Sequence, residues 1–302
     1  MRFNFATRLG LILCGVTALA VAAMGTAAYL DGRSTILGAL TAELYARAIE
    51  KQSNVDTWAE GLLAEIGNLA ASPGLVKLAD ALQREPGNPE PRLDLQRELT
   101  ERTSSDEDLA ALALVDTRSG ALLAGSPDSH RLGPVHGEVI ANGKAGPWIG
   151  DVGPIDQQAG ERTIVAAVPV QASGGTAVLA ALIRADFLVK IAHRRSGLRQ
   201  TDDSYLLNEM GDAMVAPLLP DAADRPAVAP ASTEAARRCL RHNDGLVFDS
   251  DVLGRPAVSV YRCLPRMRWC LVVSVSRAEA LPTSLSMAGV SCFSACSPLP
   301  AP

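Results

Sequence analysis

Three cysteines, Cys239, Cys263 and Cys270, are the side chains of this sequence with the clearest capacity for chemistry. The other three of its six cysteines lie in an apolar N-terminal stretch or in the C-terminal tail. The spacing contains no Cys-x-x-Cys pair and no histidine at the separation that a zinc site uses, so we expect no metal. In an oxidising compartment, two of the three thiols are expected to pair.

A β-hairpin would bring two of these sulfurs together. If residues 265–268 form the turn between two strands, Cys263 and Cys270 lie directly opposite each other, with Cβ atoms about 4.5 to 5.5 Å apart and somewhat closer where a bridge forms. Cys239 belongs to the helix expected before these strands and could instead reach either one. The pair Cys263–Cys270 is one candidate disulfide, Cys239 is the alternative partner, and the sequence does not choose among the pairings.

Common enzyme motifs are absent from the 302 residues. There is no Gly-x-Ser-x-Gly, no Gly-x-Gly-x-x-Gly, no Walker loop, no His-Glu-x-x-His and no EF-hand loop. A formal net charge of −5, without a cluster of Lys and Arg, is unlike a surface that binds nucleic acid. We therefore expect no catalysis, no cofactor and no nucleic-acid partner.

Residues 9–30 form an apolar stretch of 22 residues without a charged side chain. At about 1.5 Å rise per residue, a helix of this length crosses a hydrocarbon core of about 30 Å. Arg2 and Arg8 precede it and Asp31 follows it, which predicts that residues 1–8 are cytoplasmic and that the bulk is periplasmic, anchored in the inner membrane. A cleaved signal peptide is the alternative, but its apolar region is usually only about 7 to 15 residues long.

A long helix is predicted to follow the span, over residues 31–82, with an interruption at 72–74. One apolar stripe runs along it at spacings of three and four, formed by Val55, Trp58, Leu62, Ile66 and Leu69. Prolines and a Gly-Asn pair predict a loop over 84–92, and a short helix over 93–102. The stripe could pack on its own domain, which we favour, or pair with the same helix of a second subunit to form a homodimer.

Two β-hairpin patterns then occur twice. The first hairpin is predicted at 112–124 and again at 205–216, and the second at 163–183 and again at 256–275. Gly120 and Gly211 are 91 positions apart, and Arg184 and Arg277 are 93 apart. The nearly equal offsets indicate a duplicated α+β unit of about five antiparallel strands. Helical material is expected between the second and third strands, including a short helix over 233–240, and the long helix is expected to cover one sheet face.

A membrane span, a long helix and two PAS-like sheet units resemble the double Cache sensor domain of bacterial transmembrane receptors. The segments that carry the resemblance are 112–126, 146–170, 204–217 and 253–281. The resemblance implies a membrane-distal subdomain over 83–195 that holds a small-ligand pocket. It also implies a membrane-proximal subdomain over 196–281 that relays the signal, followed by an irregular tail over 282–302.

Receptors with this domain are chemoreceptors, sensor histidine kinases and diguanylate cyclases, which continue into a second span and a cytoplasmic output module. The segment after Leu281 contains no apolar run long enough to span a membrane. On this resemblance we expect the sequence to be a receptor truncated or frameshifted before its second span.

The resemblance also supplies candidate ligand-binding residues. In Cache domains that bind amino acids, an arginine two residues before a tryptophan holds the ligand carboxylate, and an acid at the end of the fifth strand takes the ammonium group. Trp148 matches this tryptophan, but Gly146 stands at the arginine position and Leu182 at that of the acid. The usual amino-acid recognition is therefore weakened, because a buried carboxylate needs a cationic donor.

Other side chains could take over these roles. Lys144 or Arg162 could supply the cation. Trp148 could be a pocket wall or a core residue, since aromatic rings line both. Asp151 could be a polar group of the pocket or, as we favour, an exposed loop residue.

The sequence as a whole predicts the extracytoplasmic sensor module of a transmembrane receptor, binding a small carboxylate or amine in its distal subdomain. One alternative is a module that binds a periplasmic partner protein through its outer surface without a small ligand. A second and weaker alternative is an exported enzyme.

Overall fold

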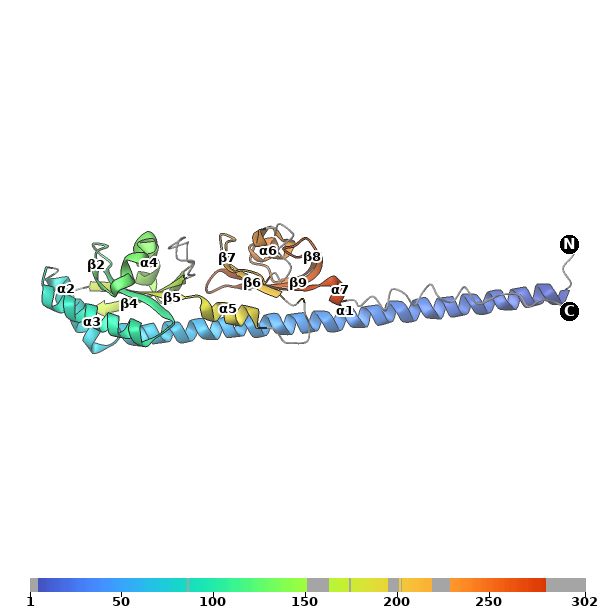
Figure 1. The fold of residues 1–302 in the computed structure, drawn as a ribbon, viewed down its shortest axis with the longest axis horizontal. Helices are drawn as coiled ribbons and strands as arrows, with labels where there is room; N and C mark the ends of the chain where they lie inside the picture. Colours follow the sequence, from blue (N-terminus) through green and yellow to red (C-terminus); the bar gives the residue numbers. More distant parts are fainter. Residues whose placement is uncertain are drawn as a thin grey trace.

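The fold is built on one helix, α1 (Phe5–Ala70), along which two five-stranded antiparallel sheets lie side by side (Figure 1). The computed structural model describes residues 5–85, 87–150, 163–173, 175–194, 201, 203–218 and 229–280. Within these residues, the predicted α+β fold with a long N-terminal helix and two sheet units is confirmed.

The apolar stripe predicted on α1 packs inside the molecule. Val55 and Ile66 are fully buried, and Trp58, Leu62 and Leu69 are partly buried against the same core. This core is continuous along α1 and includes side chains from both sheets. The two sheet units therefore share one helix as their common support.

Two shorter helices turn the chain back towards the first sheet. Helix α2 (Pro73–Arg84) begins at the predicted interruption, where the side chain of Ser72 caps it by accepting a hydrogen bond from Leu75 N. Helix α3 (Pro89–Ser105) begins earlier than predicted, inside the proposed loop 84–92. Asn88 caps it, and Pro89 is tolerated as its first residue because an N–H there has no helical partner.

The distal sheet has the strand order β2-β1-β5-β4-β3. Its strands are β1 (Leu109–Asp116), β2 (Leu122–Gly125), β3 (Trp148–Gly150), β4 (Thr163–Ala172) and β5 (Gly175–Arg184). Between β2 and β3 come the 3-10 helix η1 (Pro127–Val135) and helix α4 (His136–Ala145), and α5 (Asp186–His193) follows β5.

The proximal sheet repeats this arrangement with the order β7-β6-β10-β9-β8. Its strands are β6 (Asp203–Leu207), β7 (Ala213–Val215), β8 (Gly245–Ser250), β9 (Pro256–Leu264) and β10 (Trp269–Ser276). The helical segments are η3 (Pro230–Ser232), α6 (Glu234–Cys239) and α7 (Arg277–Ala280). Gly120 and Gly211 have φ of 70° and 87° in the equivalent first turns, which confirms the duplication read from their offset.

The molecule is layered. Helix α1 covers one face of both sheets, and α4 and α6 lie on the opposite faces (Figure 1). Each of these outer faces has its own apolar cluster, separate from the core along α1. The outer faces are therefore independent environments, one in each subdomain.

Helix α5 joins the subdomains and is held on α1 at both of its ends. At its start, the ring of Phe187 stacks on Trp58 of α1 with centroids 6.2 Å apart. At its end, the buried ammonium group of Lys51 donates hydrogen bonds to Ala192 O and, over 2.6 Å, to Ser204 Oγ of β6. A displacement of α5 would therefore act directly on α1.

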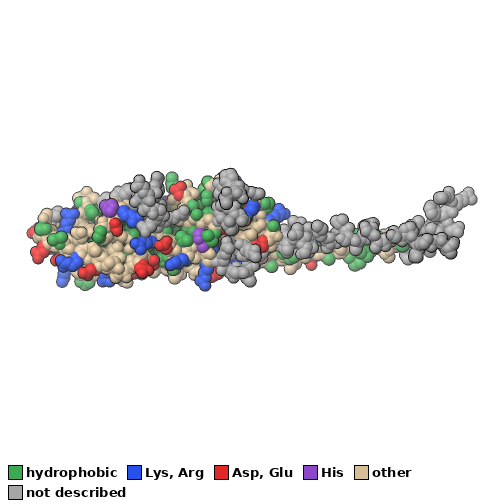
Figure 2. Space-filling model, viewed as in Figure 1, with side chains coloured by type: hydrophobic (Ala, Val, Ile, Leu, Met, Phe, Trp, Pro, Cys, Tyr) green, Lys and Arg blue, Asp and Glu red, His purple; other side chains and the backbone are tan. Residues whose placement is uncertain are grey.

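The N-terminal part of α1 is apolar, and every side chain that the structure describes there, from residue 14 to residue 30, is exposed. Among the described residues, α1 is the one helix long and apolar enough to cross a membrane. Val16, Leu19 and Met24 are all more than half exposed, and Figure 2 shows green side chains along this narrow end beside the charged surface of the sheet units. Transfer of this apolar surface from water into lipid would be favourable.

Candidate ligand-binding site

The outer face of the distal sheet, beneath α4, carries Trp148 and Leu182, two of the residues predicted to bind the ligand. The apolar cluster on this face is formed mainly by small side chains: Ala110, Ala111, Ala113, Leu132, Val139, Val165, Ala167, Val178, Ala180 and Leu182. Helix α4 approaches the sheet closely at Gly143, where a Cβ would lie 2.8 Å from the Cβ of Ala167. The sheet face is thus apolar, and α4 is fixed over it.

Trp148 belongs to this face. It begins β3, pairs with Ala167 of β4 and is half-buried against the apolar cluster. Its ring lies over Gly150, where a Cβ would come within 1.8 Å of the ring carbon Cη2. Only glycine leaves room for the ring in this position, so β3 itself sets the direction of the tryptophan.

The other predicted residues are distributed unevenly. Leu182, on β5, is fully buried in the same cluster as the residues that Trp148 contacts. Lys144, near the end of α4, is exposed. Asp151 and Arg162 lie outside the described residues. The structure therefore brings Trp148 and Leu182 together on one face. Their roles in ligand binding stay predictions.

Sequence reasoning overlooked Arg131. This residue lies in η1, which packs against β1 and α4, and two of its guanidinium nitrogens, Nε and Nη2, are buried. A partly buried guanidinium group is suited to a carboxylate, which it can bind in a bidentate manner. Nothing in the local sequence marks Arg131, because its burial follows from how η1 folds onto the sheet.

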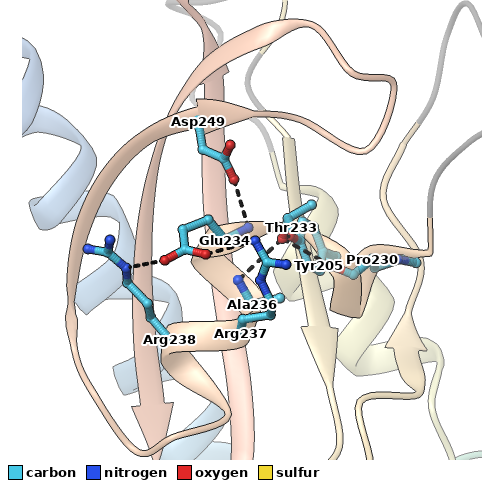
Figure 3. A network of polar contacts seen from close by, with 8 residues as sticks. All are labelled: Tyr205, Pro230, Thr233, Glu234, Ala236, Arg237, Arg238 and Asp249. Atoms are coloured by element: carbon cyan, nitrogen blue, oxygen red, sulfur yellow. Dashed lines mark hydrogen bonds and ion pairs between the residues drawn. The ribbon is translucent and has the colours of Figure 1, made fainter.

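The equivalent face of the proximal sheet is closed by α6, as Figure 3 shows. Thr233 caps this helix by accepting a hydrogen bond from Ala236 N over 3.2 Å, and its hydroxyl also bonds the Tyr205 hydroxyl at 2.9 Å. The carboxylate of Asp249 accepts a hydrogen bond from Glu234 N over 2.7 Å. These polar groups satisfy one another within the subdomain and serve to hold α6.

Burial has a clear electrostatic effect in this network. Removal from water raises the pKa of Tyr205 to about 12, although the hydrogen bond with Thr233 opposes the shift. The phenol therefore stays neutral throughout the physiological pH range. Tyr205 is thus a buried residue of β6 whose hydroxyl holds the first residue before α6, and this role is structural.

A disulfide also ties α6 to the sheet. It joins Cys239 to Cys270, with Cα atoms 5.8 Å apart, so the candidate pair Cys263–Cys270 is wrong and the alternative with Cys239 is present. The register that places Cys263 opposite Cys270 is nevertheless confirmed. The pairing differs because α6 lies across this face and points the buried side chain of Cys239 at β10.

A cavity of about 670 Å³ lies elsewhere, in the groove between α1 and α3 beside β1. Its floor includes Leu62, Ile66 and Leu112, and its rim includes Glu65 and Arg102. This groove is on the α1 side of the distal sheet, the face opposite Trp148 and Leu182. It is therefore distinct from the site that the resemblance predicts.

Comparison with known proteins identifies the fold and leaves the family undetermined. No protein-family model matches the sequence, and no curated protein matches it. Solved structures do match. The extracellular domain of rpHK1S-Z16, a protein named as a histidine kinase, has a TM-score of 0.55 and 15% identity, covering 83% of this chain and 98% of that one.

Two further solved structures are similar over most of the chain. The ligand-binding domain of the amino acid chemoreceptor PctB of Pseudomonas aeruginosa PAO1, in complex with L-Arg, has a TM-score of 0.51 and 17% identity, covering 79% of this chain and 96% of that one. A domain of a sensory box/GGDEF family protein from Vibrio parahaemolyticus has a TM-score of 0.50 and 11% identity, covering 78% of this chain and 95% of that one. The chain therefore has the same fold as these domains, although its sequence is at most 17% identical to theirs.

Proposed function

We propose that this chain is the extracytoplasmic sensor of a transmembrane signalling receptor in the inner membrane and that it binds a small molecule in its distal subdomain. The observation that carries the proposal is the combination of a double Cache fold with one long helix, α1. The N-terminal part of α1 is apolar, and the rest of it runs beneath both sheets. In this role the chain binds and does not catalyse. Solved domains of this fold include ligand-binding domains of chemoreceptors.

The contrast between the two outer faces supports the distal subdomain as the binding site. On the proximal face, α6 is capped by Thr233 and tied by the Cys239–Cys270 disulfide. On the distal face, Trp148 is only half-buried against a floor of small side chains. A ligand entering beneath α4 would meet an aromatic wall and an apolar floor, which is the usual composition of a small-molecule site.

The ligand we propose carries a carboxylate or an amine. Arg131 is our candidate for the carboxylate, because two of its guanidinium nitrogens are buried in the segment that packs against α4 and β1. Leu182 at the position of the usual acid gives an ammonium group no charged partner from β5. Recognition would therefore rest on a carboxylate more than on an α-amino group.

The binding signal would leave the site through β5 and α5. Leu182 lies on β5, which leads within two residues of its end into α5. Helix α5 is held on α1 by the Phe187–Trp58 stack and by Lys51. A ligand that binds one arrangement of β5 more tightly than another would shift α1 between two positions.

Replacing Arg131 with alanine is expected to weaken binding of carboxylate ligands. The full chain in detergent is first screened with organic acids, amino acids and amines at millimolar concentration, and the compound with the largest rise in melting temperature is titrated by calorimetry. A hydrogen bond to a charged group contributes roughly 1.5 to 3 kcal/mol, so the dissociation constant of Arg131→Ala should rise by about 10- to 150-fold.

Arg97→Ala is the matched control, because Arg97 is an arginine of α3 whose side chain is 68% exposed, and its loss should change the affinity little. No shift with any compound of the panel would contradict the small-molecule proposal and favour a module that binds a periplasmic protein. A binding compound whose affinity is unchanged in Arg131→Ala would leave the sensor role intact and exclude Arg131 from the site.

We also propose that two copies of the chain pair along α1. The side of this helix away from the sheets exposes Ala42, Ala46, Ile49 and Ser53 at spacings of three and four residues, and Ile49 is 52% exposed. In a chain with Cys14, Cys292 and Cys296 replaced by serine, Ile49→Cys is expected to give a disulfide-linked dimer on mild oxidation of membranes, seen on a non-reducing gel. Phe248→Cys, at a side chain 55% exposed on β8, should remain monomeric, and equal cross-linking of both variants would contradict pairing along α1.

A further inference from the structure

The structure gathers three sulfur atoms on one patch of the proximal sheet. The disulfide joins Cys239 of α6 to Cys270 of β10, and the free thiol of Cys263 stands directly opposite Cys270 in the β9–β10 register. The sulfur of Cys239 also lies 3.2 Å from the carbonyl oxygen of Arg262, the residue before Cys263. A thiol thus faces a disulfide at the separation of a cross-strand pair, about 4.5 to 5.5 Å between Cβ atoms.

We propose that these three cysteines form a thiol–disulfide exchange centre, in which the bond Cys239–Cys270 is passed to Cys263–Cys270. The Cys263 thiolate attacks Sγ of Cys270, a Cys263–Cys270 bond forms, and the Cys239–Cys270 bond breaks. Cys239 leaves as a thiolate and takes up a proton. One disulfide and one thiol stand on each side of the reaction, so no oxidant or reductant is consumed.

His242 is placed to start this reaction. Its Nδ1 atom lies 3.6 Å from Sγ of Cys263. Partial burial and the negative charge of Asp244 raise the pKa of the Cys263 thiol, so the thiol needs a base, and a neutral imidazole can take its proton. Arg262 forms an ion pair with Asp244 over 2.8 Å and reduces the opposing charge.

The exchange would change how α6 is held. In the observed pairing, the disulfide ties α6 to β10, across the outer face of the proximal sheet. In the exchanged pairing, it would join β9 to β10, two strands that are already paired over eight residue pairs. Helix α6 would then keep its packing, its cap at Thr233 and the hydrogen bond from Glu234 N to Asp249, and would lose its covalent tie to the sheet. The proximal subdomain would therefore have a tethered and an untethered form of the same fold.

Peptide mapping tests the exchange, because trypsin separates the three cysteines. Cleavage after arginine gives fragments 239–241, 263–266 and 269–277, with one cysteine each. The full chain, with Cys14, Cys292 and Cys296 replaced by serine, is incubated at pH 8 without oxidant or reductant, blocked with N-ethylmaleimide, digested and analysed by mass spectrometry. We expect the label on fragments 263–266 and 239–241, with fragment 269–277 linked to each in turn.

Two variants make the result specific. Cys239→Ser should form the Cys263–Cys270 bond on mild oxidation while the chain stays folded, and His242→Gln should slow the exchange roughly 100-fold, the lower end of what a positioned base contributes. Label confined to fragment 263–266 after prolonged incubation would overturn the proposal. So would a Cys239→Ser variant that stays folded with both remaining thiols free.

Discussion

Leu182→Asp is expected to lower the free energy of unfolding of the distal subdomain by about 3 to 5 kcal/mol, the cost of leaving a buried charge without compensation. Leu182 is fully buried, and its cluster consists of apolar side chains. The carboxyl group could escape part of this cost by staying protonated, yet it would still be a polar group in apolar surroundings. Urea unfolding combined with hydrogen exchange should show faster exchange in β1–β5 and unchanged exchange in β6–β10.

Leu182→Met is the matched control, because it conserves volume and should cost less than about 1.5 kcal/mol. A Leu182→Asp variant as stable as the Met variant would contradict the assignment of Leu182 to a dry floor. It would mean that water or a cation reaches this position. The acid position of amino-acid-binding Cache domains would then be open in this chain as well, and an amine ligand would become the better candidate.

The fold could be predicted because its signals are local and occur twice. Gly120 and Gly211 mark turns that need a positive φ, and the apolar runs beside them have the length of strands. The start of α3 was predicted too late, because a proline normally signals a loop. Pro89 instead occupies the first position of the helix, which suits a proline. Errors of this kind move a boundary and leave the topology unchanged.

The candidate site could be predicted only in part, because the residues proposed for it meet through tertiary packing. Trp148 and Leu182 were found by resemblance, and the structure places both on the outer face of the distal sheet. Arg131 carries no local signal, and its burial depends on the path of η1. The disulfide depends on where α6 lies over β9 and β10, which the spacing of Cys239, Cys263 and Cys270 does not contain.

The largest effect is expected from charges placed in the apolar segment of α1. Each arginine near the centre of a span costs about 2.5 to 3.5 kcal/mol of insertion free energy, so Leu19→Arg combined with Ala23→Arg should cost roughly 5 to 7 kcal/mol. We expect this double variant to leave the membrane pellet after a carbonate wash. Wild-type protein should stay in the pellet and keep its N-terminal residues.

The control places the same two charges beyond the predicted span. Ala42→Arg combined with Ala46→Arg keeps the spacing of four residues, on an exposed side of α1, and should remain in the pellet. A soluble wild-type protein that begins after residue 22 would contradict the anchor and favour a cleaved signal peptide. The distinction decides the mechanism, because α1 is one unbroken helix of 66 residues, roughly 100 Å long. Only an anchored α1 can carry a movement from the contacts of Lys51 and Trp58 with α5 into the membrane.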